Sequence, residues 1–256
     1  MANATKNEIN YYDDKKHNYV DFWEGRDYEH FAEVAAIDKL LKNRHFAYAA
    51  DLGGGYGRLS PTLLSYSDNL YLIDPSIKQL DIGKKRMASK KNVEYLIMDK
   101  ENKIPLGAES VDLLVMVRVS HHLHEPLKTF KDINRVLKPG GMAIVEIASQ
   151  ADMLNRLKYA SKLKPVPKTS TKIGQFANGK EESTPFYNHH PKTMLKLLKE
   201  AGFKPVKVLS VSNLRNQKVK KTLKVDQMVK IETKLQSPLA KIYFGPSIFI
   251  LAEKIS

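Results

Sequence analysis

Apolar positions recur with two different periods along this chain, and the period changes at regular intervals. The short apolar runs of strand length are Phe46–Leu52, Leu70–Ile73, Val93–Met98, Val111–Val117 and Met142–Ala148. The run VDLLVMV is apolar at almost every position, which is typical of a strand buried on both faces. Segments with helical spacing lie between the runs. This alternation predicts a mainly parallel sheet with helices on both faces.

Helix signals separate the apolar runs. Ser60-Pro61 predicts a helix start, with the serine as N-cap and the proline in the first turn. Apolar residues recur at helical spacing in Ile77–Ala88 and between Leu127 and Leu137. The sequence Lys138-Pro139-Gly140-Gly141 is expected to end the second helix and to turn the chain before the fifth strand.

This regular pattern stops after Ala148. Residues 150–188 are basic and rich in Pro, Ser and Thr, without clear periodicity, so we expect an insert that is either a mobile segment or a lid. Regular elements return as a helix at Pro191–Ala201, a strand near 205–211, a basic helix at about 219–236 and a last strand at 242–252. The predicted division is a helical, aromatic-rich cap at 1–45, one α/β domain at 46–149 and 189–256, and the insert at 150–188.

Composition narrows the class of protein. The 256 residues suffice for one elaborated α/β domain. The absence of cysteine excludes disulfides, thiolate metal sites and thiol nucleophiles. The polar start of the chain has no apolar core of signal-peptide type, and no apolar run is long enough to span a bilayer. We therefore expect a soluble, cytoplasmic protein.

The net charge of +14 is unevenly distributed. Residues 156–180 hold seven Lys or Arg and no Asp or Glu, and residues 192–241 are also strongly basic. Such segments are usually solvated helix faces or flexible chain. The alternative is attraction of an anionic partner, such as nucleic acid, a phosphorylated substrate or a membrane surface.

A glycine-rich turn follows the first predicted strand in the run Asp51-Leu52-Gly53-Gly54-Gly55-Tyr56-Gly57. Glycines at this position allow bare backbone to approach a ligand. A dehydrogenase fingerprint would need a third glycine at position 58, where this chain has arginine. Asp74 and Asp99 end the second and third strands, at the sheet edge where open α/β proteins bind ligands.

With these features the chain resembles the class I methyltransferases, particularly the bacterial small-molecule branch with the ubiquinone/menaquinone-type enzymes. DLGGGYG is similar to the family's first motif, LYLID to its acidic second strand end, and LKPGG to its turn before strand five. The resemblance covers about residues 46–148, and GPSIFILAEK resembles the family's last strand. It implies a Rossmann-like doubly wound sheet of seven strands in the order 3-2-1-4-5-7-6, with the last strand antiparallel.

The resemblance also implies S-adenosylmethionine as the cofactor and S-adenosylhomocysteine as the product. Gly53 and Gly55 would pack against the methionine and ribose parts, and Asp51 would lie near the cofactor's amino group. Asp74 would accept hydrogen bonds from the ribose hydroxyls. Arg118 lies where the family's backbone often touches the methionine part.

Further contacts are expected around the adenine and from the N-terminal cap. Pro75 would flank the adenine, and Met98 with Asp99 would line its pocket. Tyr19 and Arg26 are candidates in the aromatic N-terminal segment, which often lies over the cofactor in this family. Tyr19 could stabilise a sulfonium by cation–π contact, and Arg26 could bind the cofactor carboxylate. The alternative for the aromatic residues is packing of an amphipathic helix.

The acceptor is expected just beyond strand four and beside the insert. The histidines that follow strand four are His121, His122 and His124. His122 is the candidate general base or acceptor ligand, with a surface or capping histidine as the alternative, and no metal site is expected. Phe186, Tyr187 and His190 are candidate acceptor contacts. The alternative is that this loop only anchors the helix from Pro191.

The predicted function is in-line methyl transfer from S-adenosylmethionine to a small-molecule acceptor. The positive charge of the insert would favour an acidic or phosphorylated acceptor. One alternative is an RNA methyltransferase, although strand four ends in VRVSHH and not in an Asn/Asp-Pro-Pro-Tyr/Phe motif. The other is a non-catalytic S-adenosylmethionine-binding protein.

Overall fold

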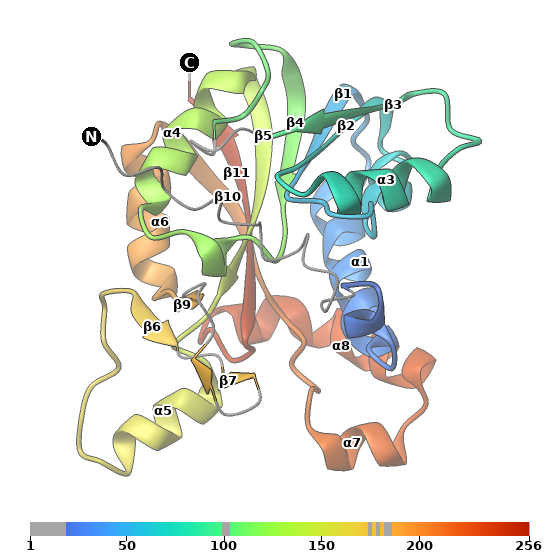
Figure 1. Ribbon diagram of the computed structural model, residues 1–256. Coiled ribbons are helices and arrows are strands. Elements are labelled where there is room, and N and C mark those ends of the chain that lie inside the picture. The colour runs from blue at the N-terminus through green and yellow to red at the C-terminus, as the bar shows by residue number, and fades with distance from the viewer. Residues whose placement is uncertain (1–18, 99–102, 174–175, 178–179, 182–185, 256) are drawn as a thin grey trace, which may run out of the picture.

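A central sheet of seven strands organises the molecule (Figure 1). The computed structural model describes residues 19–98, 103–173, 176–177, 180–181 and 186–255. The strands of the central sheet are β1 (Phe46–Leu52), β2 (Ser67–Asp74), β3 (Val93–Ile97), β4 (Val111–Met116), β5 (Leu137–Ala148), β10 (Phe203–Val211) and β11 (Ser247–Lys254).

Their spatial order is β10-β11-β5-β4-β1-β2-β3. Counting only these strands along the chain, this is the order 3-2-1-4-5-7-6, so the predicted topology is confirmed. The five strands from β1 to β5 are parallel, and β11 runs antiparallel to both β5 and β10.

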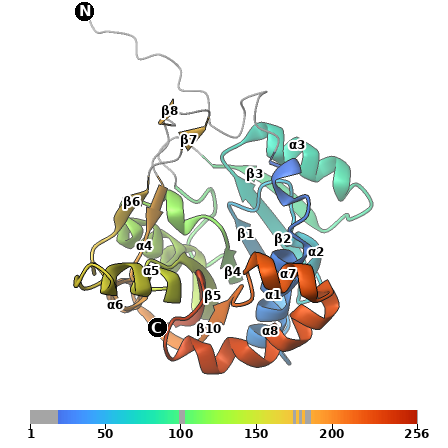
Figure 2. The same ribbon diagram turned by 90° about the horizontal axis from the view of Figure 1, so that it is seen from below.

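Helices cover both faces of the sheet (Figures 1 and 2). One face carries α4 (Pro126–Val136) and α6 (Pro191–Glu200). The other carries α1 (Asp27–Leu41), α2 (Ser60–Leu63), α3 (Ile77–Arg86) and α8 (Val225–Ala240). Strand β4 serves both layers, because Leu114 and Met116 pack into one core while Leu113 and Val115 pack into the other. The prediction that this run is buried on both faces is therefore confirmed.

Two local predictions at helix ends need correction. Ser60 does not cap α2, since its hydroxyl donates to the Asp51 carboxylate at 2.8 Å, and the N-cap is Leu59. The Lys138–Gly141 segment lies inside β5, which already pairs with β4 at Leu137. The next pair beyond Val111–Leu137 is Leu113–Met142, so the four residues bulge from the ladder. The helix α4 ends at Val136, as the turn residues predict.

The C-terminal elements also differ from the pattern-based boundaries. The single basic helix expected at 219–236 is two helices, α7 (Gln217–Thr222) and α8, separated by extended backbone at Leu223 and Lys224. Leu223 packs against the core, and the Gln227 side chain accepts the Lys224 N–H, so a second helix begins there. The last strand starts at Ser247, five residues later than expected. The backbone at Tyr243 has a φ of 49°, in the left-handed region, so the chain there is not extended.

The segment after β5 has its own small elements. It contains α5 (Met153–Ala160), a two-stranded sheet of β6 (Thr171–Ile173) with β9 (Phe186–Asn188), and a second pair, β7 (Phe176–Ala177) with β8 (Lys180–Glu181). In Figures 1 and 2, α5 and α7 lie on opposite sides of the lower end of the molecule. None of the helices in the described part of the chain has the length and apolar character needed to cross a bilayer.

Candidate functional site

The glycine turn after β1 depends on backbone angles that favour glycine. Gly53, Gly55 and Gly57 have φ values of 68°, 57° and 76°, in the left-handed region. The Gly53 N–H donates to the Ile73 carbonyl at 2.8 Å, which joins the turn to β2. A Cβ on Gly53 would lie 2.2 Å from Cγ2 of Val119, so the chain leaving β4 passes directly against this turn.

Asp74, at the carboxyl end of β2, holds the turn in place. One carboxylate oxygen accepts the Gly55 N–H and the other accepts the Ser76 N–H, both at 2.9 Å. Ser76 in turn caps α3 by accepting the Gln79 N–H. The carboxylate therefore has a fixed position beside bare glycine backbone, at the place where the sequence predicts a ribose contact.

Asp51 lies beneath the turn. Its side chain is buried and accepts a hydrogen bond from the Ser60 hydroxyl, and burial raises the pKa of its carboxyl to about 6. A Cβ on Gly54 would come within 2.7 Å of this carboxylate. The observed role of Asp51 is to brace the turn, and its contact with a ligand remains a prediction.

An apolar patch continues from Asp74 along the ends of β2 and β3. Ile77 and Ile97 have exposed fractions of 59% and 49%, which is high for isoleucine. Pro75 lies next to Asp74, and the Met98 N–H donates to the Asp74 carbonyl at 3.1 Å. Asp99 lies outside the described residues, so its predicted adenine contact remains a prediction.

Tyr19 lies over the glycine turn. A Cβ on Gly55 would be 3.7 Å from the Tyr19 ring, and the ring makes an edge contact with Tyr56 at 6.1 Å between centroids. Burial raises the pKa of the Tyr19 hydroxyl. Arg26 stacks on the Phe22 ring at 3.7 Å instead of pairing with a carboxylate. The N-terminal segment thus contacts the site through aromatic rings.

Glu33 was not a candidate from the sequence, yet it joins the parts of the site. It lies on α1 with no exposed surface, and its two carboxylate oxygens pair with different arginines. Arg58, which follows the glycine turn, contributes one contact at 2.5 Å, and Arg118, at the end of β4, contributes contacts at 2.6 and 2.7 Å. Burial opposes ionisation, but the two guanidinium groups hold the pKa of Glu33 below its usual value.

Arg118 is fixed on both its backbone and its side chain. Its φ of 63° is unusual for a residue other than glycine, and its N–H donates to the buried Glu146 carboxylate at 3.1 Å. Trp23 covers this cluster, with the Arg58 guanidinium 3.5 Å from its ring centre. A strained residue at a strand end, held by buried charges, is typical of a functional site.

The histidines after β4 form a cluster with the predicted acceptor residues. Rings of His121 and His122 lie 4.9 and 4.8 Å from the Phe186 ring, and His124 contacts Tyr187 edge-on at 5.5 Å. Burial lowers the pKa of His122 to about 4, so its imidazole is neutral at pH 7. The tertiary structure therefore brings Phe186 to His122 and Tyr187 to His124.

His190 does not join this cluster. Its Nδ1 accepts the Lys192 N–H at 3.2 Å and caps α6, so the observed contact is the anchoring one. Its neighbour His189 faces the cluster instead, because its ring stacks on Tyr187 with 6.4 Å between centroids. The same ring contacts the Ser120 carbonyl and the Ser170 hydroxyl, each at 2.8 Å. Adjacent residues of extended chain point to opposite sides, and sequence reasoning had no signal to choose between them.

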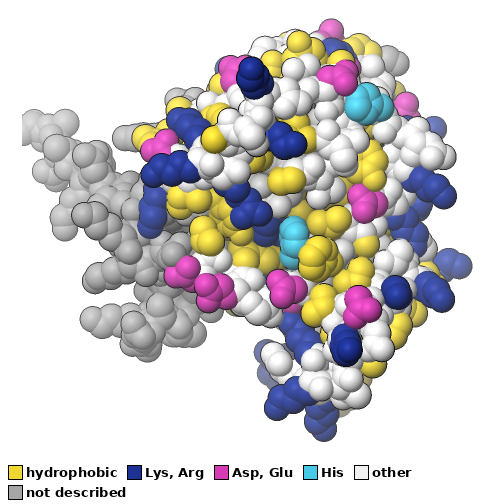
Figure 3. All heavy atoms as spheres, turned by 90° about the vertical axis from the view of Figure 1, so that its right-hand side faces the viewer, with side chains coloured by type: hydrophobic (Ala, Val, Ile, Leu, Met, Phe, Trp, Pro, Cys, Tyr) yellow, Lys and Arg dark blue, Asp and Glu magenta, His cyan; other side chains and the backbone are white. Residues whose placement is uncertain are grey.

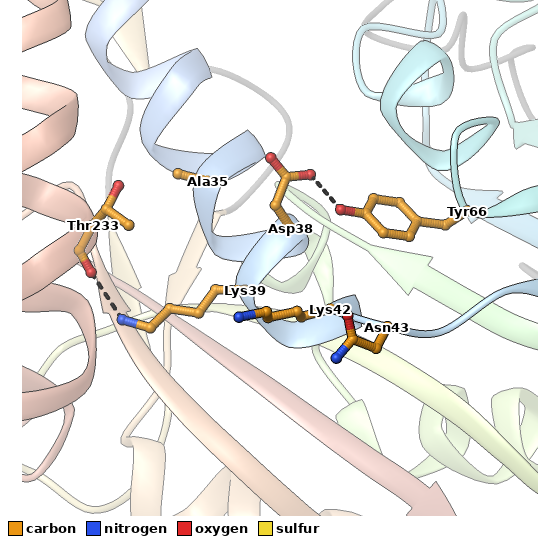
Figure 4. A pocket seen from close by; sticks show the side chains of 7 residues that line it. All are labelled: Ala35, Asp38, Lys39, Lys42, Asn43, Tyr66 and Thr233. Atoms are coloured by element: carbon orange, nitrogen blue, oxygen red, sulfur yellow. Dashed lines mark hydrogen bonds between the residues drawn. The ribbon is translucent and has the colours of Figure 1, made fainter.

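A separate hollow of about 670 Å³ lies at the opposite edge of the sheet, before the starts of β1 and β2 (Figure 4). Two of its polar side chains are paired, with the Tyr66 hydroxyl donating to Asp38 and the Lys39 ammonium donating to the Thr233 carbonyl. It contains none of the predicted site residues. Within the described residues, no three His, Asp or Glu side chains are grouped so as to hold a metal ion.

Other proteins are similar in sequence to the segment that contains the glycine turn, Asp74 and β4. Residues 50–145 match the family described as a methyltransferase domain. A malonyl-[acyl-carrier protein] O-methyltransferase from Marinomonas sp. is 34% identical over 106 residues, covering 40% of this chain and 38% of the relative. A demethylmenaquinone methyltransferase from Staphylococcus aureus is 33% identical over 144 residues, covering 54% and 58%. The chain thus spans between about two fifths and three fifths of the length of these relatives.

Two solved structures share the fold over nearly the whole chain. A methyltransferase from Thermotoga maritima has a TM-score of 0.60 and 21% identity, covering 92% of this chain and 94% of that one. A methyltransferase from Aquifex aeolicus has a TM-score of 0.56 and 17% identity, covering 93% and 100%. At these identities the likeness concerns the fold alone.

We predict that Glu33→Gln destabilises the protein by about 3–5 kcal/mol, because it leaves two buried guanidinium groups without their shared carboxylate. Denaturant unfolding measures this. Asp81→Asn is the matched control, since it breaks an exposed ion pair with Lys84 that contributes at most about 1 kcal/mol. A Glu33→Gln variant as stable as the control would contradict the structural role of this cluster.

We predict that His122 makes the protein less stable at acidic pH. The folded pKa of about 4 lies below the ordinary value of 6.5, so between these values the unfolded chain binds more protons and stability falls as pH decreases. From pH 7 to pH 5 the wild type should lose about 2 kcal/mol more than His122→Asn. The exposed His124→Asn variant is the matched control. If all three proteins lost the same unfolding free energy between pH 7 and pH 5, the pKa of His122 would not be lowered by folding.

Proposed function

We propose that this chain, which carries a domain of the class I S-adenosylmethionine-dependent methyltransferase family, is an enzyme that methylates a small-molecule acceptor. The observation that carries the proposal is the glycine turn fixed by Asp74 and covered by Tyr19. This combination presents backbone, a carboxylate and an aromatic face at the carboxyl end of a parallel sheet.

The side chains present fit the proposed cofactor. Asp74 is positioned to accept the ribose hydroxyls, while Pro75 and Met98, with the exposed Ile77 and Ile97 beside them, offer an apolar surface for the adenine. In this proposal Gly53 and Gly55 lie against the methionine and ribose parts, and Arg118 faces the methionine end with Arg26 nearby. Asp51 supports the turn from below.

The chemistry requires positioning more than side-chain reactivity. When bound, S-adenosylmethionine supplies a methyl group on a positively charged sulfonium, which an acceptor nucleophile attacks in line. Tyr19 excludes water from the turn and offers a ring face to positive charge. The rigid strand ends hold the donor side of the site, which lowers the barrier through orientation.

His122 and the aromatic residues of β9 are the proposed acceptor side. A neutral imidazole can accept a proton or a hydrogen bond from the acceptor, and the low pKa keeps it in this form at pH 7. Phe186 stacks on the same histidines and Tyr187 lies beside His124, so a flat acceptor would find ring faces there. Phe186 and Tyr187 are therefore retained as proposed substrate contacts, and His190 is the weakest of the three.

The two curated relatives are named for different acceptors, one a malonyl-acyl-carrier protein and the other demethylmenaquinone. Their names agree on methyl transfer and disagree on the acceptor. An RNA acceptor is the second candidate because Lys and Arg side chains gather at the lower end of the face in Figure 3, where α7 lies. Salt-dependent binding of bulk RNA would favour this alternative.

The insert is proposed to act as a lid beside the acceptor. Its strand β9 contacts the short 3-10 helix Ser120–His122, so it adjoins the histidine cluster directly. The division into an N-terminal cap, the α/β domain and this insert accords with that role. A lid that excludes water would favour methyl transfer over side reactions.

We predict that the purified protein binds S-adenosylmethionine and S-adenosylhomocysteine in calorimetry, because the glycine turn and Asp74 match these ligands. NAD and ATP are the comparison ligands, since they also bind at such turns. If the protein bound NAD or ATP but neither S-adenosylmethionine nor S-adenosylhomocysteine, the proposed function would be overturned.

We predict that Asp74→Ala weakens binding of S-adenosylhomocysteine by about 10- to 150-fold, corresponding to about 1.5–3 kcal/mol for hydrogen bonds to a charged group. Asp68→Ala is the matched control, because Asp68 lies on the same strand but is exposed and paired with His45. Calorimetry on both variants, after unfolding curves confirm that each is folded, measures the effect. Equal affinity of the two would remove Asp74 from the cofactor site.

A further inference from the structure

A second hollow, of about 370 Å³, lies where α5, the start of α6 and the chain after α8 meet. Its lining residues are Ala151, Arg156, Val166, Lys168, His190, Lys192, Lys241, Ile242 and Tyr243. They come from four separate parts of the sequence, so the hollow is a product of the tertiary fold. None of the residues proposed for methyl transfer lines it except His190, whose contact there is the α6 cap.

Positive charge converges on this hollow. The lining includes four cationic side chains and no carboxylate. The four are Lys168, Lys192, Lys241 and Arg156. Within the described residues, none of the three lysines forms an ion pair. Arg156 is fixed by donating a hydrogen bond to the Ile242 carbonyl. The three lysines are exposed on the rim, so water screens their mutual repulsion, and an anion that enters the hollow meets four positive charges.

The pKa of His190 responds to the positive charges that line the hollow. This pKa is lowered, first by burial and then by the charges of Lys192, Lys168 and Arg156, which line the same hollow. Because Nδ1 of His190 accepts the Lys192 N–H, the ring is held at the edge of the hollow. The neutral imidazole adds a further polar group without adding repulsion.

The remaining walls are apolar. Ala151, Val166, Ile242 and Tyr243 complete the lining, and apolar atoms provide most of its surface. A fully hydrated inorganic ion would gain little from such walls, whereas an organic anion could bury its carbon skeleton against them. The volume matches a small organic molecule and leaves no room for a folded protein segment.

The hollow lies behind the proposed acceptor cluster. Residues 189 and 190 form the partition, since the ring of His189 contacts Ser120 on one side while the ring of His190 lines the hollow on the other. The Gln150 N–H donates to the His189 carbonyl at 3.1 Å, which fixes this partition to the chain after β5. The two sites are therefore separate surfaces of one segment.

We propose that this hollow is a binding site for an organic phosphate, with the phosphate among Lys168, Lys192, Lys241 and Arg156 and the carbon skeleton against Ile242 and Tyr243. A phosphate monoester carries nearly two negative charges at pH 7, which several convergent cations match better than they match a carboxylate. This inference depends on the hollow alone and does not require the proposed methyl transfer.

The phosphate can come from a soluble monoester or from a lipid headgroup, and the experiment separates the two. Leu154 and Leu157 on α5 have exposed fractions of 78% and 59%, so apolar side chains adjoin the basic hollow on the outer surface. Calorimetry with phenyl phosphate, inorganic phosphate and benzoate tests the soluble source. Sedimentation with phosphatidylcholine vesicles, with and without phosphatidic acid, tests the lipid source.

The test variant is the triple substitution Lys168→Gln, Lys192→Gln and Lys241→Gln. The control is Lys158→Gln, Lys196→Gln and Lys204→Gln, which removes the same net charge from exposed lysines outside the hollow. Unfolding curves establish that both variants are folded. We expect phenyl phosphate to bind more tightly than inorganic phosphate or benzoate, and the test variant to bind it at least tenfold more weakly than the control.

Two results would support the proposal and two would overturn it. Loss of phenyl phosphate binding in the test variant alone assigns a soluble ligand, and loss of binding to phosphatidic acid vesicles in the test variant alone assigns a lipid headgroup. Equal weakening in both variants would mean that net charge, not the hollow, attracts the anion. Absence of wild-type binding to every phosphate probe at millimolar concentration would also overturn it, whatever the outcome of cofactor binding.

Discussion

The arrangement of the site depends on the ion pairs that the buried carboxylate of Glu33 forms with two arginines. The carboxylate pairs with Arg58 beyond the glycine turn and with Arg118 at the end of β4, so one side chain from α1 joins the segment after the turn to the end of a strand. A buried charge with these partners is not easily moved, since losing either one leaves an uncompensated ion away from water. The N-terminal helix is thereby part of the site and not only a cover for the sheet.

The proposed donor side of the site is held by buried groups in the same way. Gly55 and Ser76 hold the Asp74 carboxylate, while Glu146 holds the strained backbone of Arg118. Buried strand ends and several hydrogen bonds leave these groups few alternative positions, which is the condition for catalysis by orientation. Burial also raises the pKa of Glu146, although Arg118 opposes the shift, so this region contains closely balanced charges.

The proposed acceptor side is built differently. Its rings come from the short helix after β4 and from β9, which belongs to the insert, and they meet through stacking and not through ion pairs. Such contacts can be exchanged for contacts with a ligand ring at little cost. The partition at residues 189–190 then divides a neutral, aromatic surface from a basic hollow, so two chemically distinct surfaces lie on either side of one extended segment.

The local sequence by itself determined the α/β alternation, the glycine turn and the position of Asp74, because these depend on periodicity, on glycine's access to positive φ and on the geometry of strand ends. The strand order came from the resemblance that those motifs carry. Only the tertiary structure decided that Glu33 joins Arg118 across 85 residues, that Ser60 bonds Asp51 instead of capping a helix, and that His189 and His190 face opposite sides. These features are pairings between distant side chains, and each partner has an ordinary local alternative as an exposed acid, a cap or a loop histidine. The choice is made by which polar side chains become buried against each other, and the local pattern of apolar positions does not specify such pairs.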